Sequence, residues 1–264
     1  MASDTDSGID MAKRNFIYDR LSRKIASEER GKAQREAERM RQEFTANVSH
    51  ELKTPLQSIS GYAELLKSGM VKEEDVQQFA DRIYSESQRM ITLVNDILEL
   101  SHLDEGMGDM VREDVDLYEV AIDAVNSLKE EAGAENVSLD LTGEQSIING
   151  YARLLSLIVY NLCENGIKYN NPRGSVKVDV NNFDDRIVLT VNDNGIGIPL
   201  DQQERVFERF YRVDKSHSKE VGGTGLGLSI VKHAAAIHNG EIHLVSVPKY
   251  GTTITITFPK EVHN

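Results

Sequence analysis

The stretch FTANVSHELKTPLQSISGYAELL, residues 44–66, has apolar residues at every third or fourth position. This spacing places them on one face of a helix. They are Phe44, Val48, Leu52, Leu56, Ile59, Ala63 and Leu66. Pro55 lies within the same pattern, although a proline removes one backbone donor and costs about 3 kcal/mol in a helix interior. His50 precedes this proline by five residues, and the stretch therefore raises the question of what the histidine does.

The helical pattern continues upstream. From about Asn15 to Leu66, Pro55 is the only proline, so one long helix is the simplest prediction. Residues 28–44 are highly charged and carry a thin apolar seam with steps of four, three and four, which is typical of a coiled coil. The seam consists of Ala33, Ala37, Met40 and Phe44. We expect a partner helix to cover it, and the alternative of a solvated single helix stays open.

A second helix is expected after the break KSGMVKEED, residues 67–75. Its stripe alternates steps of four and three, and Phe79, Ile91 and Leu98 widen it beyond a two-helix seam. The stripe consists of Val76, Ala80, Ile83, Ser87, Met90, Val94, Ile97 and Ser101. Two such helices form a hairpin with more apolar surface than one pair can cover. We therefore expect a homodimer that closes a four-helix bundle.

Short strands alternate with helices after residue 110. Strands are expected at 111–117, 137–142 and 146–150, and helices at 118–133 and 151–170. Hairpins are expected at 174–193, with the turn at Asp184 and Asp185, and at 240–259. Strands paired by hairpins, with helices on one face, predict an α/β sandwich. The chain is therefore predicted to be α+β, with two domains joined near Gly106 and Gly108.

The composition excludes several classes of protein. The formal net charge of −13 argues against nucleic acid or an anionic membrane surface as the main partner. Cys163 is the single cysteine, which excludes an internal disulfide and suits a reducing compartment. No apolar run approaches the length of a membrane span, so we expect the chain as given to be cytoplasmic.

Polar residues and glycines gather in four segments of the second domain. NLCENGIKYNN, residues 161–171, places Asn161, Asn165 and Lys168 on neighbouring faces of one helix. Amides at that spacing can hold a hydrated Mg²⁺ and phosphate oxygens, and the lysine supplies charge. DNGIGIP follows a strand, and its glycines let the backbone approach a flat ligand. Asp193, at the strand end, can accept a hydrogen bond from an exocyclic amine such as that of adenine.

The other two segments are VFERFYRVDKSHSKEVGG, residues 206–223, which mixes aromatic residues with cations, and GGTGLGLSIVK, residues 222–232. The second is a glycine-rich loop that runs into a helix, and free amides at a helix N-terminus bind phosphate. It is not a Walker loop, because no Gly-Lys-Ser/Thr ends it. Taken alone the loop is a weak signal, but four such segments in this order predict a nucleotide site.

SHELKTPL, NLCENGIKY, DNGIGIP, VFERFYRVD and GGTGLGLSIVK resemble the H, N, G1, F and G2 boxes of the sensor histidine kinases of bacterial two-component systems. The resemblance covers about Phe44 to Pro259 in the family's order. It implies a HisKA-type dimerisation and phosphotransfer hairpin, followed by an ATP-binding domain of the GHKL superfamily. The implied boundaries are 1–43 for an N-terminal tail and coiled-coil signalling helix, 44–106 for the hairpin and 107–264 for the catalytic domain.

The resemblance implies an ATP-dependent protein-histidine kinase that autophosphorylates on His50 and passes the phosphoryl group to an aspartate of a response regulator. His50 lies roughly 200° around the helix from Val48 and from Leu52, so it points away from the bundle seam. Glu51 can hold its other ring nitrogen or take its proton. Thr54, one turn further on, is expected to position a water that removes phosphate from the regulator. The alternative, that its hydroxyl only bonds a backbone carbonyl, stays open.

ATP and Mg²⁺ are the cofactors that the resemblance implies. Asn161 and Asn165 are the expected holders of Mg²⁺, and Asn161 is also counted among the catalytic residues. Arg209 and Arg212 are counted there too, because their charges can stabilise the transition state. The expected nucleotide-binding residues are Asn161, Asn165, Lys168, Tyr169, Asp193, Gly195, Gly197, Ile198, Phe207, Lys215, Gly223, Thr224, Gly225, Leu226, Gly227 and Leu228.

Two other functions stay open. A GHKL ATPase would hydrolyse ATP with water, but in those relatives a glutamate takes the place of Asn161, and an amide cannot abstract a proton. A non-catalytic signalling scaffold with a degenerate pocket is the second alternative, and the intact boxes argue against it. The expected partners are a second copy of the chain and a receiver domain, without nucleic acid, and the parent protein is expected to be anchored in a membrane upstream.

Overall fold

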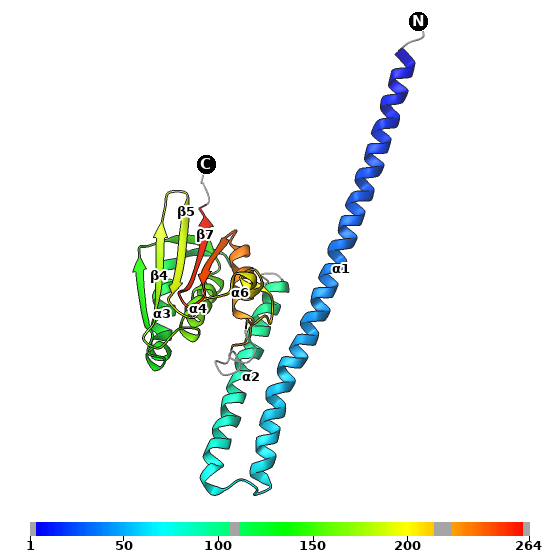
Figure 1. The fold of residues 1–264 in the computed structure, drawn as a ribbon. Coiled ribbons are helices and arrows are strands. Elements are labelled where there is room, and N and C mark those ends of the chain that lie inside the picture. The colour runs from blue at the N-terminus through cyan, green and yellow to red at the C-terminus, as the bar shows by residue number, and fades with distance from the viewer. Residues whose placement is uncertain (1–3, 106–110, 214–222, 261–264) are drawn as a thin grey trace. The chain divides into compact units, whose positions relative to one another are not determined.

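The computed structural model describes residues 4–105, 111–213 and 223–260, and the chain divides into two compact units, residues 1–54 and 55–264. Helix α1 (Asp4–Lys67) runs without interruption through Pro55 (Figure 1). The predicted long helix is confirmed, and it begins earlier than Asn15. The predicted linker glycines Gly106 and Gly108 lie outside the described residues. None of the described helices has a stretch that is long and apolar enough to span a membrane.

A helical hairpin follows, as predicted. A turn containing Gly69, whose φ is +68°, leads through the 3-10 helix η1 (Glu73–Asp75) into α2 (Val76–Glu105). The ring of Tyr62 meets the ring of Phe79 edge to face with centroids 5.5 Å apart, and the Arg82 guanidinium lies 5.9 Å from the Tyr62 centroid. These contacts join the last turns of α1 to the first turns of α2, because aromatic pairs of this geometry are attractive.

The rest of the chain alternates strands and helices. In order they are β1 (Glu113–Asp116), α3 (Leu117–Ala134), β2 (Ser138–Gly143), β3 (Ile147–Gly150), α4 (Ala152–Lys168), β4 (Ser175–Asn182), β5 (Arg186–Asp193), the 3-10 helices η2 (Leu200–Gln202) and η3 (Arg205–Phe207), α6 (Gly227–Ile237), β6 (Glu241–Val247) and β7 (Gly251–Pro259). Every strand and helix that the sequence predicted in this region is present, with ends that differ by a few residues.

The strands form a five-stranded sheet in the order β2-β4-β5-β7-β6 and a separate antiparallel pair, β1-β3. Both predicted hairpins, β4-β5 and β6-β7, are antiparallel. Strand β2 pairs with β4 in parallel, which requires the intervening chain to cross over the sheet, and α4 makes that crossover. The closing hairpin β6-β7 joins the sheet through β7, which pairs with β5 from Arg186↔Pro259 to Asp193↔Thr252.

One face of the sheet is apolar and the other is polar, as alternation along each strand requires. The inward residues of the central strands are fully buried, and α4 contacts β4 and β5 on that face. They are Val176, Val178, Val180, Ile187, Leu189, Ile256 and Phe258. On the other face hydroxyl and amide side chains pair across strands, with Asn192 Nδ2 donating to Thr253 Oγ1 at 2.6 Å. This is the predicted sandwich with helices on one side (Figure 1).

A buried histidine fixes the two helices that carry the candidate site. His238 Nε2 accepts from the backbone N–H of Tyr151 at 2.9 Å, and Nδ1 lies 2.8 Å from the carbonyl oxygen of Ala234. Since a backbone N–H only donates and a carbonyl only accepts, the ring is neutral with its proton on Nδ1. Burial lowers the pKa of His238, which favours this neutral form. The start of α4 is thereby tied to the end of α6.

Candidate functional site

His50 stands on the outside of α1. Its side chain is 81% exposed, and its Nδ1 lies 3.9 Å from Glu51 Oε1. That separation places the carboxylate where it can attract a proton on Nδ1, while the ring stays open to an incoming group. The position agrees with the outward orientation predicted from the helical spacing. Thr54 Oγ1 donates to the carbonyl oxygen of His50 at 3.2 Å, so in this structure the hydroxyl makes the backbone contact that had been left open as an alternative.

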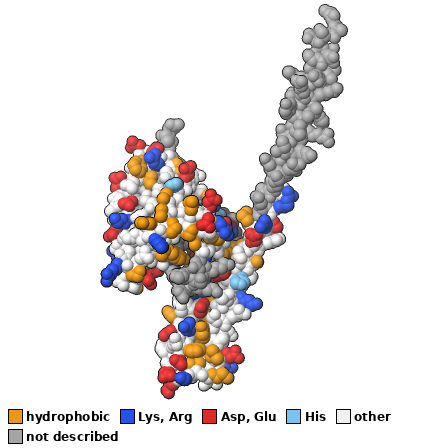
Figure 2. All heavy atoms as spheres, in the orientation of Figure 1, with side chains coloured by type: hydrophobic (Ala, Val, Ile, Leu, Met, Phe, Trp, Pro, Cys, Tyr) orange, Lys and Arg blue, Asp and Glu red, His pale blue; other side chains and the backbone are white. Residues whose placement is uncertain are grey.

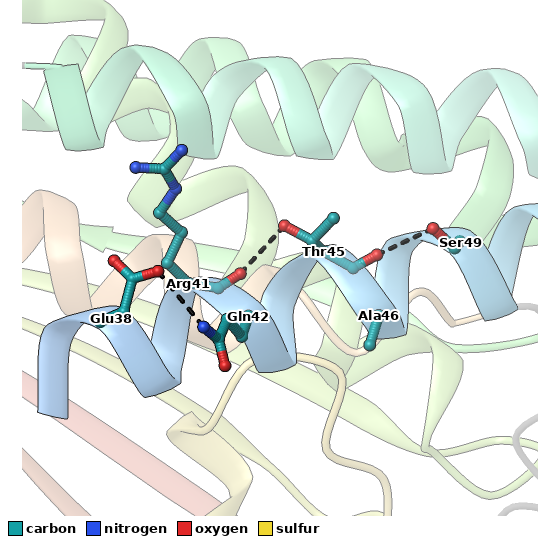
Figure 3. Close-up of a pocket in the computed structure, with 6 residues that line it drawn as sticks. All are labelled: Glu38, Arg41, Gln42, Thr45, Ala46 and Ser49. Atoms are coloured by element: carbon teal, nitrogen blue, oxygen red, sulfur yellow. Dashed lines mark hydrogen bonds between the residues drawn. The ribbon is translucent and has the colours of Figure 1, made fainter. Parts of the chain in front are cut away.

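A shallow hollow lies on α1 before the histidine (Figure 3). Its lining residues all belong to one face of this single helix, and they are Glu38, Arg41, Gln42, Thr45, Ala46 and Ser49. The hydroxyls of Thr45 and Ser49 donate to carbonyl oxygens four residues back, at 3.0 and 2.9 Å. These two hydroxyl protons are therefore used within the helix.

The predicted asparagines lie against the glycine-rich loop. Asn161, on α4, is 8% exposed and its Nδ2 donates to the carbonyl oxygen of Leu157 at 2.8 Å. This turns Oδ1 toward Gly227 at the start of α6, where a Cβ would lie 2.6 Å from it. The same Cβ would lie 3.7 Å from Asn165 Nδ2. The two segments, about 60 residues apart in sequence, therefore meet, and a larger residue at position 227 would push the Asn161 amide out of this position.

Lys168 and Tyr169 close the end of α4. Lys168 Nζ pairs with Glu164 Oε1 at 2.8 Å, so the cation is held on this helix one turn from Asn165. The Tyr169 hydroxyl lies 2.7 Å from where a Cβ on Gly223 would be, which places the ring beside the loop. Burial raises the pKa of Tyr169, and the charges of Arg212 and Lys168 oppose that shift. The phenol therefore stays neutral and can wall an apolar base pocket.

Asp193 ends β5 as a half-buried carboxylate. Its Oδ1 accepts from the backbone N–H of Gly195 at 2.8 Å and from that of Thr252 at 3.2 Å. Burial raises the pKa of Asp193, and these two hydrogen bonds oppose the shift. Both of these hydrogen bonds reach Oδ1, which leaves Oδ2 as the oxygen that a ligand's amine can approach. The sequence did not indicate Thr252, because its contribution comes from the backbone of a distant strand.

The loop after Asp193 is pinned to the β6-β7 turn. The Ile198 N–H donates to Ser246 Oγ at 2.8 Å, and Gln203 Nε2 donates to the carbonyl oxygens of Ile198 and Ser246 at 3.0 and 2.8 Å. Gly197 has a φ of +68°, and a Cβ there would lie 2.2 Å from the Val247 carbonyl oxygen. This close approach requires glycine. Ser246 and Gln203 are site-supporting residues that sequence reasoning missed, since polar residues beside a turn are common.

The glycine-rich loop is held by its own threonine and by the preceding segment. Thr224 Oγ1 accepts from the Leu226 N–H at 3.3 Å, and the carbonyl oxygen of Gly225 accepts from the Phe210 N–H at 2.8 Å. Leu226 is fully buried and anchors the start of α6. The loop thus lies beside α4 at Asn161 and Tyr169, and the segment after β5 meets the end of α4, where the Ile196 N–H donates to the Tyr169 carbonyl oxygen at 3.0 Å.

Arg209, which was predicted to offer charge to the transition state, pairs with a carboxylate of α2. Arg209 donates from Nη1 and Nη2 to the two carboxylate oxygens of Asp104 on α2, at 2.9 and 2.7 Å. Lys215 lies outside the described residues. The structure also brings α2 carboxylates to the site, Asp96 among them, and the periodicity of α2 had drawn attention only to its apolar stripe.

Two family models match the chain. Residues 40–106 match the His Kinase A (phospho-acceptor) domain, and residues 150–262 match the histidine kinase-, DNA gyrase B- and HSP90-like ATPase. The first match contains His50, and the second contains the asparagines, the end of β5 and the glycine-rich loop. The matches therefore fall on the hairpin and on the sandwich, in the order that the motifs predicted.

Named relatives agree with these matches. The chain is 40% identical over 228 residues to the sensor-like histidine kinase SenX3 of Mycolicibacterium smegmatis, covering 84% of this chain and 58% of SenX3. It is 38% identical over 235 residues to the sensor protein kinase WalK of Staphylococcus aureus, covering 87% of this chain and 56% of WalK. The chain thus spans little more than half the length of these relatives.

Solved structures share the fold. The histidine kinase ThkA in complex with the response regulator protein TrrA matches with a TM-score of 0.66 at 22% identity, over 83% of this chain and 61% of that one. The Acinetobacter baumannii histidine kinase AdeS matches with a TM-score of 0.66 at 20% identity, over 81% of this chain and 98% of that one. The predicted fold, a helical hairpin followed by a GHKL-type sandwich, is confirmed.

Proposed function

The chain belongs to the sensor histidine kinases, and from this premise we propose that it phosphorylates its own His50 with ATP and passes the phosphoryl group to an aspartate of a response regulator. The observation that carries the proposal is the meeting of Asn161 and Asn165 with Gly227 at the start of α6. Amide oxygens, a lysine and the free N–H groups of a helix start are the groups that bind a triphosphate. The complex of ThkA with TrrA supports a receiver domain as the partner.

The reaction needs little beyond position and charge. Nε2 of His50 would attack the γ-phosphorus as the bond from that phosphorus to ADP breaks, while Glu51 attracts the proton on Nδ1, 3.9 Å away. Asn161 Oδ1, turned toward the loop, fits a ligand for Mg²⁺, and Asn165 is the second candidate. When bound, Mg²⁺ would neutralise charge on the phosphate oxygens.

Hydrolysis of ATP by water is the competing function. It requires a general base near the γ-phosphate, and the side chain closest to Gly227 on α4 is the amide of Asn161, which cannot take a proton. The exposed His50 offers a nucleophile instead. We therefore favour transfer to histidine over hydrolysis.

Incubating the purified chain with ATP labelled on the γ-phosphate tests the proposal. The expected result is protein-bound phosphate that is labile in acid and stable in base, followed by its transfer to one member of a panel of receiver domains. Release of inorganic phosphate without labelled protein would instead identify an ATPase. A chain that binds no ATP would instead be consistent with the non-catalytic signalling scaffold.

We further propose that the hairpin removes phosphate from the regulator with the help of Thr54. Its hydroxyl donates to the His50 carbonyl in this structure, and a hydroxyl oxygen can accept a hydrogen bond as well as donate one. Thr54→Ala is expected to leave autophosphorylation intact and to slow the loss of phosphate from a cognate regulator by at least about tenfold, because positioning of water contributes strongly to such steps. The measurement is the decay of labelled regulator with ADP present.

Thr54→Ser is the matched control for this variant, since it keeps the hydroxyl. It should dephosphorylate the regulator at nearly the wild-type rate. If Thr54→Ala and Thr54→Ser both retain the wild-type rate, the hydroxyl only supports the helix around Pro55 and the proposal of a phosphatase role for it is wrong.

We also propose that the hairpin dimerises. Helix α2 leaves a stripe of large apolar side chains exposed, namely Tyr84, Ile91, Val94 and Leu98, and hydrophobic side chains reach the surface of the hairpin in Figure 2. A contiguous apolar stripe of this kind marks an interface. A second copy of the hairpin would cover it in a four-helix bundle. The matched domain 40–106 supports this bundle and the proposed boundaries 44–106 and 107–264.

Replacing Leu98, which is 52% exposed, by glutamate is expected to yield a folded monomer, because the charge would be buried only in the dimer. Light scattering at micromolar concentration measures the result. Met70→Glu is the matched control, because Met70 is also exposed but lies in the turn, outside the stripe. A wild-type chain that is already monomeric would contradict the bundle.

A further inference from the structure

The C-terminal half of α2 lies against the catalytic domain. Leu93, Leu100 and Leu103 are almost fully buried, at spacings of seven and three residues, and α2 contacts α6 there (Figure 1). The exposed stripe of α2 lies on another face. Helix α2 therefore carries two apolar faces, and the one that faces α6 serves to dock the helix on the catalytic domain.

Three carboxylates of α2 accompany this apolar contact, and we call Asp96, Glu99 and Asp104 the α2 acidic strip. Asp96 Oδ2 accepts from Thr224 Oγ1 at 2.6 Å, and Glu99 pairs with Arg153. Asp104 receives both Nη atoms of Arg209, at 2.9 and 2.7 Å, and its Oδ1 lies 3.7 Å from His233 Nδ1. Each carboxylate thus meets a donor of the catalytic domain.

Thr224 is a predicted nucleotide-binding residue, and Arg209 is a predicted catalytic residue that would offer charge to the transferred phosphoryl group. Thr224 lies in the glycine-rich loop, and Arg209 lies in the segment that precedes it. A guanidinium binds a carboxylate and a phosphate with the same paired geometry. A carboxylate that already holds these donors therefore stands in for phosphate oxygens.

We propose that Asp96 and Asp104 form an autoinhibitory latch, in which the α2 acidic strip competes with the phosphates of the nucleotide for Thr224 and Arg209. The inference rests on the proposed function, since it requires a nucleotide in this site. Reciprocity follows from linkage: docking of α2 weakens phosphate binding, and bound phosphates weaken docking by the same factor. A signal that moves α2 would thereby change the affinity of the site for ATP.

The surroundings of Asp96 make this latch releasable. Burial raises the pKa of Asp96 to about 6, with Glu164 and Glu99 acting in the same direction, and Thr224 and the charge of Lys168 opposing it. A carboxyl group whose pKa is higher in the docked than in the undocked state stabilises docking at low pH. This stabilisation is lost as the pH rises from about 4 through about 6. At neutral pH the ionised Asp96 is therefore costly to bury, and α2 is held less tightly.

The test compares two ligands on the full chain at pH 7, a non-hydrolysable ATP analogue and adenosine. Asp104→Asn removes the charge that pairs with Arg209, so the analogue is expected to bind about fivefold to tenfold more tightly, within the usual range of coupling between sites. Adenosine, which has no phosphates, should bind the variant and the wild type equally. Asp81→Asn is the matched control, an exposed carboxylate of α2 that bonds only Gln77 among its described contacts.

Hydrogen exchange provides a second measurement on the wild-type chain. The analogue should increase exchange of backbone amides in residues 93–104, and adenosine should not. Equal affinity of wild type and Asp104→Asn for the analogue would overturn the latch and leave the proposed function standing. An equal gain for adenosine would also overturn it, because the competition would not involve phosphates. Failure of every variant to bind the analogue would overturn the proposed function itself.

Discussion

Replacing His50 by glutamine should abolish acid-labile phosphorylation of the chain while ATP binding persists. Glutamine has a similar length, but its amide nitrogen is not a nucleophile, whereas a neutral imidazole attacks phosphorus near pH 7. The His50 side chain is 81% exposed, so the change should cost little stability. Labelling with ATP and a binding measurement on the same preparation give the two readouts. The loss of label should be complete, since no second nucleophile takes part in the proposed step.

His102 provides the matched control. It is another exposed histidine, in the last turn of α2, and the proposed mechanism gives it no role. His102→Gln should incorporate phosphate at the wild-type rate. Undiminished labelling of His50→Gln would show that the phosphate acceptor is a different residue.

The second large effect is expected at Asp193. An ionised carboxylate at the end of β5 can only accept hydrogen bonds, and we propose that Oδ2 accepts from the exocyclic amine of adenine. Asp193→Asn should weaken ATP binding by about 10- to 100-fold, because a hydrogen bond to a charged group contributes roughly 1.5–3 kcal/mol. Calorimetric titration with ATP and with GTP measures the affinity and the selectivity for the base.

Stability separates this role from a structural one. Asparagine keeps an oxygen that can accept from the Gly195 and Thr252 N–H groups. It also removes the cost of burying a charge, the same cost that raises the pKa of Asp193. The melting temperature of Asp193→Asn should therefore not fall. Asp184→Asn, in the exposed β4-β5 turn, is the control for loss of charge. Equal affinity of the wild-type chain for ATP and GTP would contradict the assignment of Asp193.

The hairpin and the strand-helix order were predictable because they depend on local patterns. The stripe that begins at Val76 repeats every three or four residues, and the structure continues that helix to Glu105. Both hairpins of the sandwich follow from short alternating strands around a turn. The roles of His50 and Asp193 came from motifs and stay predictions. The domain boundary near Gly106 also stays a prediction.

Contacts between segments that are distant in the sequence were harder to predict. Nothing in residues 138–143 indicated that β2 pairs with β4 in parallel, because that pairing depends on how α4 crosses the sheet. Arg209 was expected to offer charge to the transition state, and its pairing with Asp104 of α2 could not be predicted from the sequence. A charged side chain pairs with whatever opposite charge the fold brings near, and the sequence spacing of such pairs follows no period.

The sequence by itself therefore determined the identity of the elements, their order and the residues with suitable chemistry, since helix and strand periods and motif composition are local properties of the chain. The tertiary structure alone decided that Asn161 turns its oxygen toward Gly227 and that Asp96 bonds Thr224. Both contacts join residues more than 60 positions apart, and they form only because burial of the apolar faces of α2, α4 and α6 brings their polar neighbours together.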